Sequence, residues 1–106
     1  AEDKRGWTPL HLASKRNERD VVSSLLNAGA KVNVKEHRDR TPLHFASDTN
    51  SLNVVKRLVE AGGDVNAHNW QGRTPLHLAS RNNNKQVVKF LLESGSRISA
   101  TGNKGW

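Results

Sequence analysis

The chain has 106 residues, few enough for a single domain. It contains no cysteine, which excludes disulfides and cysteine-ligated zinc and fits an intracellular protein, either cytoplasmic or nuclear. No apolar run approaches the ~20 residues that a membrane-spanning helix needs, so no transmembrane segment is expected. The formal net charge of +7 points to a partner or surface that is acidic.

The first predicted helix begins after residue 8. Thr8 can cap the free backbone N–H groups at a helix start, and Pro9 suits the first helical position because its missing N–H is not needed there. Leu10 and Leu12 supply the apolar side of this helix. Asn17 predicts a tight turn after it, because asparagine is the commonest substitute for glycine in the left-handed conformation.

A second helix is predicted to follow that turn and to end at Gly29. Its apolar residues recur at helical spacing. They are Val21, Val22, Leu25 and Leu26. Residues 31–40 then indicate an extended connector with a turn at its tip. Asp39 stands at that tip, and aspartate tolerates a positive φ better than most residues.

This helix, turn, helix and loop pattern occurs again, with a period of 33 residues. The tetrapeptide Thr-Pro-Leu-His stands at residues 8–11, 41–44 and 74–77. A fixed period of this size is typical of stacked repeat proteins, in which each unit buries one face against its neighbour. The rows are residues 3–35, 36–68 and 69–101, followed by a partial row at 102–106. We therefore expect one repeat domain over residues 1–106. Neither end shows a polar capping unit, so we interpret the chain as a fragment of a longer array.

The pattern resembles the ankyrin repeat family over nearly the whole chain. The resemblance rests on residues 6–13 and 21–33 with their two later copies. It implies a mainly α fold, an ankyrin-type α-solenoid of stacked helix-turn-helix units joined by β-hairpin-like loops. The chain departs from the family pattern at Asp39 (usually Gly), at Gly63 (usually Ala) and at Ser99, where the other rows have Asn.

Structural roles are expected for the residues of the repeated motif. They are Thr8, Pro9, His11, Thr41, Pro42, His44, Thr74, Pro75 and His77. The resemblance implies that the histidines hydrogen-bond between backbone loops. Successive copies would lie ~8–10 Å apart, one helix-packing distance. That is too far for them to share a zinc ion, whose bonds to nitrogen are ~2.0–2.1 Å. No metal and no cofactor are therefore expected.

Catalysis has little support in the sequence. There is no cysteine nucleophile and no glycine-rich phosphate loop, and the carboxylates do not recur as pairs. Ser14, Ser47 and Ser80 recur because a small residue fits that face of the helix. We predict that the chain is not an enzyme.

A binding face is the more informative prediction. In ankyrin-like stacks the loop tips and the exposed side of the first helix of each unit line one concave face, which is usually the binding surface. Tryptophan and arginine, the residues most enriched at interface hot spots, fall on these positions, and we expect all three tryptophans to be exposed there. The candidate residues are Arg5, Trp7, Lys15, Arg16, Arg38, Arg40, Trp70, Arg73, Arg81 and Trp106.

The favoured function is a monomeric protein-interaction module whose partner segment is acidic or phosphorylated. An alternative is nucleic-acid or anionic-lipid binding, since basic residues interleaved with aromatics also describe a single-strand platform. Against that alternative, Glu36, Asp39 and Asp48 are expected to interrupt the basic stripe. A third interpretation is a structural spacer in a longer solenoid.

Overall fold

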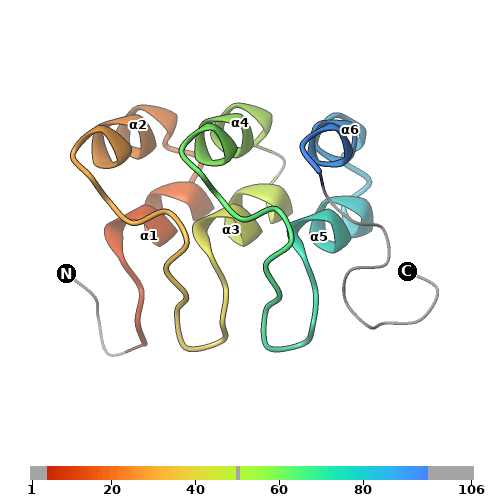
Figure 1. The fold of residues 1–106 in the computed structure, drawn as a ribbon, viewed down its shortest axis with the longest axis horizontal. Helices are drawn as coiled ribbons and strands as arrows, with labels where there is room; N and C mark the ends of the chain where they lie inside the picture. The colour runs from red at the N-terminus through yellow and green to blue at the C-terminus, as the bar shows by residue number, and fades with distance from the viewer. Residues whose placement is uncertain (1–4, 50, 96–106) are drawn as a thin grey trace.

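The computed structural model describes residues 5–49 and 51–95, which form three stacked helix pairs (Figure 1). The pairs are α1 (Pro9–Lys15) with α2 (Arg19–Asn27), α3 (Pro42–Asp48) with α4 (Leu52–Glu60), and α5 (Pro75–Arg81) with α6 (Lys85–Glu93). Helices α1, α3 and α5 form one row and α2, α4 and α6 a second row, while the connecting loops extend past the first row as narrow hairpins (Figure 1). The described part of the chain contains no β-strand. The expected mainly helical solenoid is therefore confirmed.

The first helix of each pair starts as the sequence predicts. The Thr41 hydroxyl accepts the His44 N–H (3.4 Å), while the Thr41 N–H donates to Nδ1 of the His44 ring (3.0 Å). This reciprocal capping box recurs at Thr8 with His11 and at Thr74 with His77, and each proline stands in the first turn. Histidine here does the work that glutamate or glutamine does in the usual capping box.

The predicted turn residues adopt the left-handed conformation. Asn17 and Asn83 have φ values of 58° and 56°, and Asp39 at the hairpin tip has a φ of 58°. Asn50, the third predicted turn asparagine, lies outside the described residues. Asn and Asp adopt this conformation at a lower energetic cost than most other non-glycine residues, because their short polar side chains can hydrogen-bond locally.

One apolar core runs the length of the stack, because the same positions are buried in successive repeats. Leu10, Leu43 and Leu76 are 1%, 1% and 2% exposed. Helix α3 packs between α1 and α5, and α4 packs between α2 and α6. Ser14 and Ser47 are fully buried, which agrees with the expectation that this helix face needs a small residue, whereas Ser80 is only partly buried.

Histidine and asparagine side chains tie each repeat to the next. Nε2 of His11 lies 2.9 Å from the Arg40 carbonyl oxygen, and Nε2 of His44 lies 3.0 Å from that of Arg73. Since Nδ1 of each ring accepts a backbone N–H, Nε2 carries the proton and donates it to the carbonyl. The expected bridging role is confirmed for these two histidines. On the other side of the stack, Asn33 donates to the Gly62 carbonyl (3.1 Å).

Candidate interaction surface

The second hairpin is built around the side chain of Glu36. Its Oε1 accepts the backbone N–H groups of Arg38 (2.8 Å) and Arg40 (2.9 Å), and its Oε2 accepts the Arg40 guanidinium (2.8 Å). In the third hairpin the amide oxygen of Asn69 does the same work, accepting the N–H groups of Gln71 (2.8 Å) and Arg73 (3.0 Å). One acceptor side chain at this position of the repeat is therefore enough to shape the hairpin.

Glu36 does not interrupt the basic stripe, and that sequence-based expectation was wrong. Its side chain is buried, and its charge is paired inside the hairpin with Arg40. Burial alone would raise the pKa of Glu36, but the hydrogen bonds from Arg40 and from two backbone N–H groups outweigh burial and hold the pKa below its usual value. Asp39 and Asp48 are exposed, as expected.

Adjacent hairpins are hydrogen-bonded to one another. The His37 N–H donates to the Arg5 carbonyl (2.7 Å), and the Trp70 N–H donates to the Arg38 carbonyl (3.0 Å). The three tips thus lie side by side along one edge of the molecule (Figure 1). We call this edge, together with the exposed ends of the adjoining helices, the hairpin face. It comprises residues 5–7, 37–40, 70–73, 15, 16, 48, 49, 81 and 82.

The hairpin face concentrates the positive charge. It carries seven of the 14 described Lys and Arg residues, against two exposed carboxylates. With buried Glu36 counted as well, its balance is seven minus three, or +4. The remaining described residues hold seven Lys and Arg against five Asp and Glu, or +2, over a much larger part of the chain. The face is therefore a local basic patch rather than a sample of a uniformly basic surface.

The tryptophans differ in exposure, contrary to expectation. Trp7 is only partly exposed, because the Phe45 ring of the next repeat packs against it with ring centroids 4.7 Å apart. Lys15 and Arg40 also lie over the Trp7 ring, at 5.4 Å and 5.6 Å from its centroid. Trp70 is 59% exposed, and Trp106 lies outside the described residues.

The predicted basic residues fall into two groups. Arg5, Lys15, Arg16 and Arg38 are exposed on the hairpin face. Arg81 is exposed as well, whereas Arg40 and Arg73 are partly buried, and these three residues also bond to neighbouring side chains. Arg40 pairs with Glu36, Arg73 donates to the Gln71 side chain (3.0 Å), and Arg81 pairs with Asp48 across the repeat boundary (3.2 Å).

A hollow of about 220 Å³ opens on the hairpin face between the second and third repeats. Its walls include Arg38, Arg40, Phe45, Trp70, Leu78 and Arg81. Sequence reasoning missed Phe45 and Leu78, because both look like ordinary helix core. The signal that could have revealed them is the change from Phe to Leu at one position of the repeat, next to a change from Trp to Arg at another.

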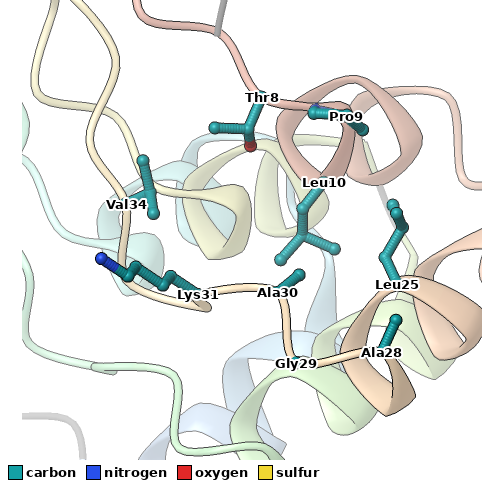
Figure 2. Close-up of a pocket in the computed structure, with 9 residues that line it drawn as sticks. All are labelled: Thr8, Pro9, Leu10, Leu25, Ala28, Gly29, Ala30, Lys31 and Val34. Atoms are coloured by element: carbon teal, nitrogen blue, oxygen red, sulfur yellow. The ribbon is translucent and has the colours of Figure 1, made fainter. Parts of the chain in front are cut away.

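A larger and more apolar hollow, about 510 Å³, lies on the outer side of the first repeat. Leu10 from α1 and Leu25 from α2 line it beside the segment that runs from Ala28 to Lys31 (Figure 2). Pro9 here is exposed, whereas its counterparts Pro42 and Pro75 are buried. This hollow is therefore the stacking surface of a repeat, distinct from the basic face.

Candidate metal-binding clusters and membrane-spanning helices are both absent from the described residues. No group of His, Asp and Glu side chains among residues 5–49 and 51–95 could hold a metal ion. None of the helices described is long and apolar enough to cross a membrane.

Known proteins agree with this architecture. A family model of three ankyrin repeats matches residues 29–102, and a single ankyrin repeat model matches residues 5–37. Human oxysterol-binding protein-related protein 1 is 66% identical over 29 residues, which are 27% of this chain and 3% of that protein. The rat protein of the same name is 62% identical over 29 residues, with the same coverage. The match thus spans a small part of these relatives' length. Repeat period, capping boxes and family models lead to one conclusion: the chain belongs to the ankyrin repeat family, whose members are generally protein–protein interaction modules.

Proposed function

We propose that this chain is a non-enzymatic interaction module that binds an acidic or phosphorylated segment of a partner protein on its hairpin face. The observation that carries the proposal is the local charge balance of +4 on that face. Exposed arginines can form paired hydrogen bonds with carboxylates or phosphates, and a basic patch speeds encounter with an acidic partner.

Protein is favoured over nucleic acid by the state of the tryptophans. A single-strand platform needs a series of open aromatic faces on which successive bases can stack. Trp7 is covered by Phe45, which leaves Trp70 as the exposed tryptophan of the described residues. A single open indole beside a few arginines suits a peptide anchor better than a track of bases.

The proposal is tested by measuring the fluorescence anisotropy of a labelled ten-residue peptide of alternating Glu and Ala, with and without added protein. We expect binding that weakens as salt rises, because exposed charges are screened. A phosphoserine peptide of the same length should bind in the same way. A ten-nucleotide thymidine strand and phosphatidylserine vesicles are the competing ligands, and tighter binding of either at equal salt would contradict the proposal.

A matched pair of variants locates the binding surface. Arg16→Gln with Arg38→Gln removes two exposed charges from the hairpin face. Lys85→Gln with Lys89→Gln removes two exposed charges from α6, outside that face. Both double variants lower the net charge by two, so an effect of net charge alone would reduce the affinity for the peptide equally in both. We expect the first pair to weaken binding of the peptide about tenfold or more, and the second pair to have a much smaller effect.

A further inference from the structure

The hollow between the second and third repeats has a filled counterpart one repeat earlier. Each residue of its wall has an equivalent 33 positions back in the chain. At that earlier junction the space between the repeats is occupied by the Trp7 indole, which packs on Phe45 at 4.7 Å and lies 6.1 Å from the His11 ring. The first junction therefore shows that an aromatic side chain fits at this position between two repeats.

Two substitutions within the repeat leave the later junction open. Arg40 stands where the first repeat has Trp7, and Leu78 stands where the second has Phe45. The Arg40 guanidinium does not take the place of the indole, because it binds Glu36 and lies 4.6 Å from the centre of the Phe45 ring. Leu78 is shorter than phenylalanine and is itself buried. A hollow of about 220 Å³ is the result.

We propose that this hollow binds an aromatic side chain of the partner segment, in the position that Trp7 occupies at the preceding junction. The inference rests on the proposed function and names the anchor of that same face. The hollow is large enough, since an apolar cavity of about 150 Å³ in a protein interior holds a benzene molecule. Its walls include the exposed side chains of Trp70, Arg38 and Arg81, which favour an aromatic guest. The buried side chains of Phe45 and Leu78 add apolar lining.

The charges around the hollow give the guest a direction. Arg38 is exposed, lies over the Trp70 ring at 5.7 Å, and forms no ion pair with any described carboxylate. On the helix side, Asp48 already holds Arg81. A carboxylate of the partner is therefore attracted more strongly to the hairpin side of the hollow, near Arg38, than to the helix side, where Asp48 already neutralises Arg81. The ligand is an acidic segment whose aromatic residue is followed or preceded by Asp or Glu at the hairpin side.

The test compares two synthetic peptides, acetyl-Gly-Glu-Glu-Phe-Glu-Glu-Gly-amide and the same peptide with Ala in place of Phe. Their affinities for the 106-residue chain are measured by titration calorimetry. We expect the Phe peptide to bind about tenfold tighter, as a buried aromatic anchor at an interface does. Equal affinities would overturn the anchor and leave the acidic binding surface standing. No binding of either peptide would overturn both.

Three variants place the aromatic ring. Leu78→Phe extends a ring into the hollow and should bring the Phe peptide down to the affinity of the Ala peptide. Trp70→Ala removes an exposed wall without touching the core, and should reduce the same preference. Leu12→Phe is the control, the same change at the matched position of the first repeat, where the side chain is 40% exposed. A preference for Phe that survives both Leu78→Phe and Trp70→Ala would show that the ring binds elsewhere and would overturn the inference.

Discussion

His44 is a residue whose ionisation is coupled to folding. Burial lowers the pKa of His44 from 6.5 to about 4, and the positive charges of Lys35 and Arg40 act in the same direction. The neutral ring is required, because its Nδ1 accepts the Thr41 N–H while its Nε2–H donates to the Arg73 carbonyl. Protonation would turn that acceptor into a donor facing a donor.

This predicts an acid-sensitive fold. Between pH 6.5 and about 4 the unfolded chain binds a proton at His44 that the folded chain does not, so the free energy of unfolding falls as pH falls, by about 3 kcal/mol over the window. The lowered pKa of His77, caused by burial and then by Arg73 and His68, adds to the same trend. Urea melts at pH 6.5 and pH 5 measure the slope. His44→Gln should lower stability at both values but flatten the slope, and an unchanged slope would contradict the assignment.

Glu36 provides a second test at the scale of single residues. Glu36→Gln keeps an oxygen for the two backbone N–H groups of the hairpin, as Asn69 does in the next repeat, but loses the contacts of Oε2 with the Arg40 guanidinium (2.8 Å) and with Nδ1 of His37 (3.2 Å). Glu36→Ala leaves both N–H groups without their acceptor and should cost about 1–3 kcal/mol of unfolding free energy. We expect thermal melts to rank wild type, Gln and Ala in that order. A Gln variant as unstable as Ala would mean that the ion pair, not the turn, is what matters.

The contrast between the turn residues Asn17 and Asp39 and the residues Glu36 and Trp7 shows which residue roles could be predicted from the sequence. Asn17 and Asp39 could be assigned their positive φ, because that conformation depends on the residue itself and its immediate neighbours. The burial of Glu36 depends on a side chain 4 positions away in the chain, and the covering of Trp7 depends on Phe45, 38 positions away. Neither could be derived from the residue and its immediate neighbours.

At the scale of elements, the Thr–His capping box stabilises the N-terminus of α1, α3 and α5. Thr41 is buried. Its N–H donates to Nδ1 of His44, and its hydroxyl lies near the same Nδ1 and accepts the His44 N–H. Thr41→Val keeps the shape of the side chain but removes the hydroxyl, so it should cost about 1–2 kcal/mol of unfolding free energy. Thr41→Ser keeps the hydroxyl and should cost less. Chemical denaturation of both variants distinguishes a cap from a shape requirement, since a Val variant more stable than the Ser variant would show that shape matters more than the hydroxyl.

Helices and hairpins could be predicted from the sequence because, like this cap, they depend on residues close together in the chain. Thr-Pro marks the start of α1, α3 and α5. A residue with positive φ follows the described helix ends within two residues, Asn17 and Asn83 after α1 and α5, and Gly29, Gly62 and Gly95 after α2, α4 and α6. The hollow was not predictable, because it arises where two elements from different repeats meet. Its existence depends on Arg40 turning toward Phe45 and Glu36 rather than toward Leu78.

At the scale of the whole molecule, the stack behaves as a line of units that stabilise their neighbours. The clearest evidence is the burial of leucine at one position of the repeat, which differs between the first and the second repeat. Leu58, in the middle repeat, is fully buried, whereas Leu25, at the same position of the first repeat, is only partly buried and lines the outer hollow (Figure 2). The two leucines stand at the same position of the repeat and differ in whether another described repeat packs over them.

This difference predicts unequal effects of one substitution. Leu58→Ala removes a fully buried side chain between two repeats and should cost about 2–5 kcal/mol of unfolding free energy. Leu25→Ala removes a side chain already next to solvent, so less apolar area is lost and the cost should be clearly smaller. Urea denaturation followed by circular dichroism measures both. Because the substitution, helix and register are matched, equal costs would mean that stability resides within each repeat rather than in the contacts between repeats.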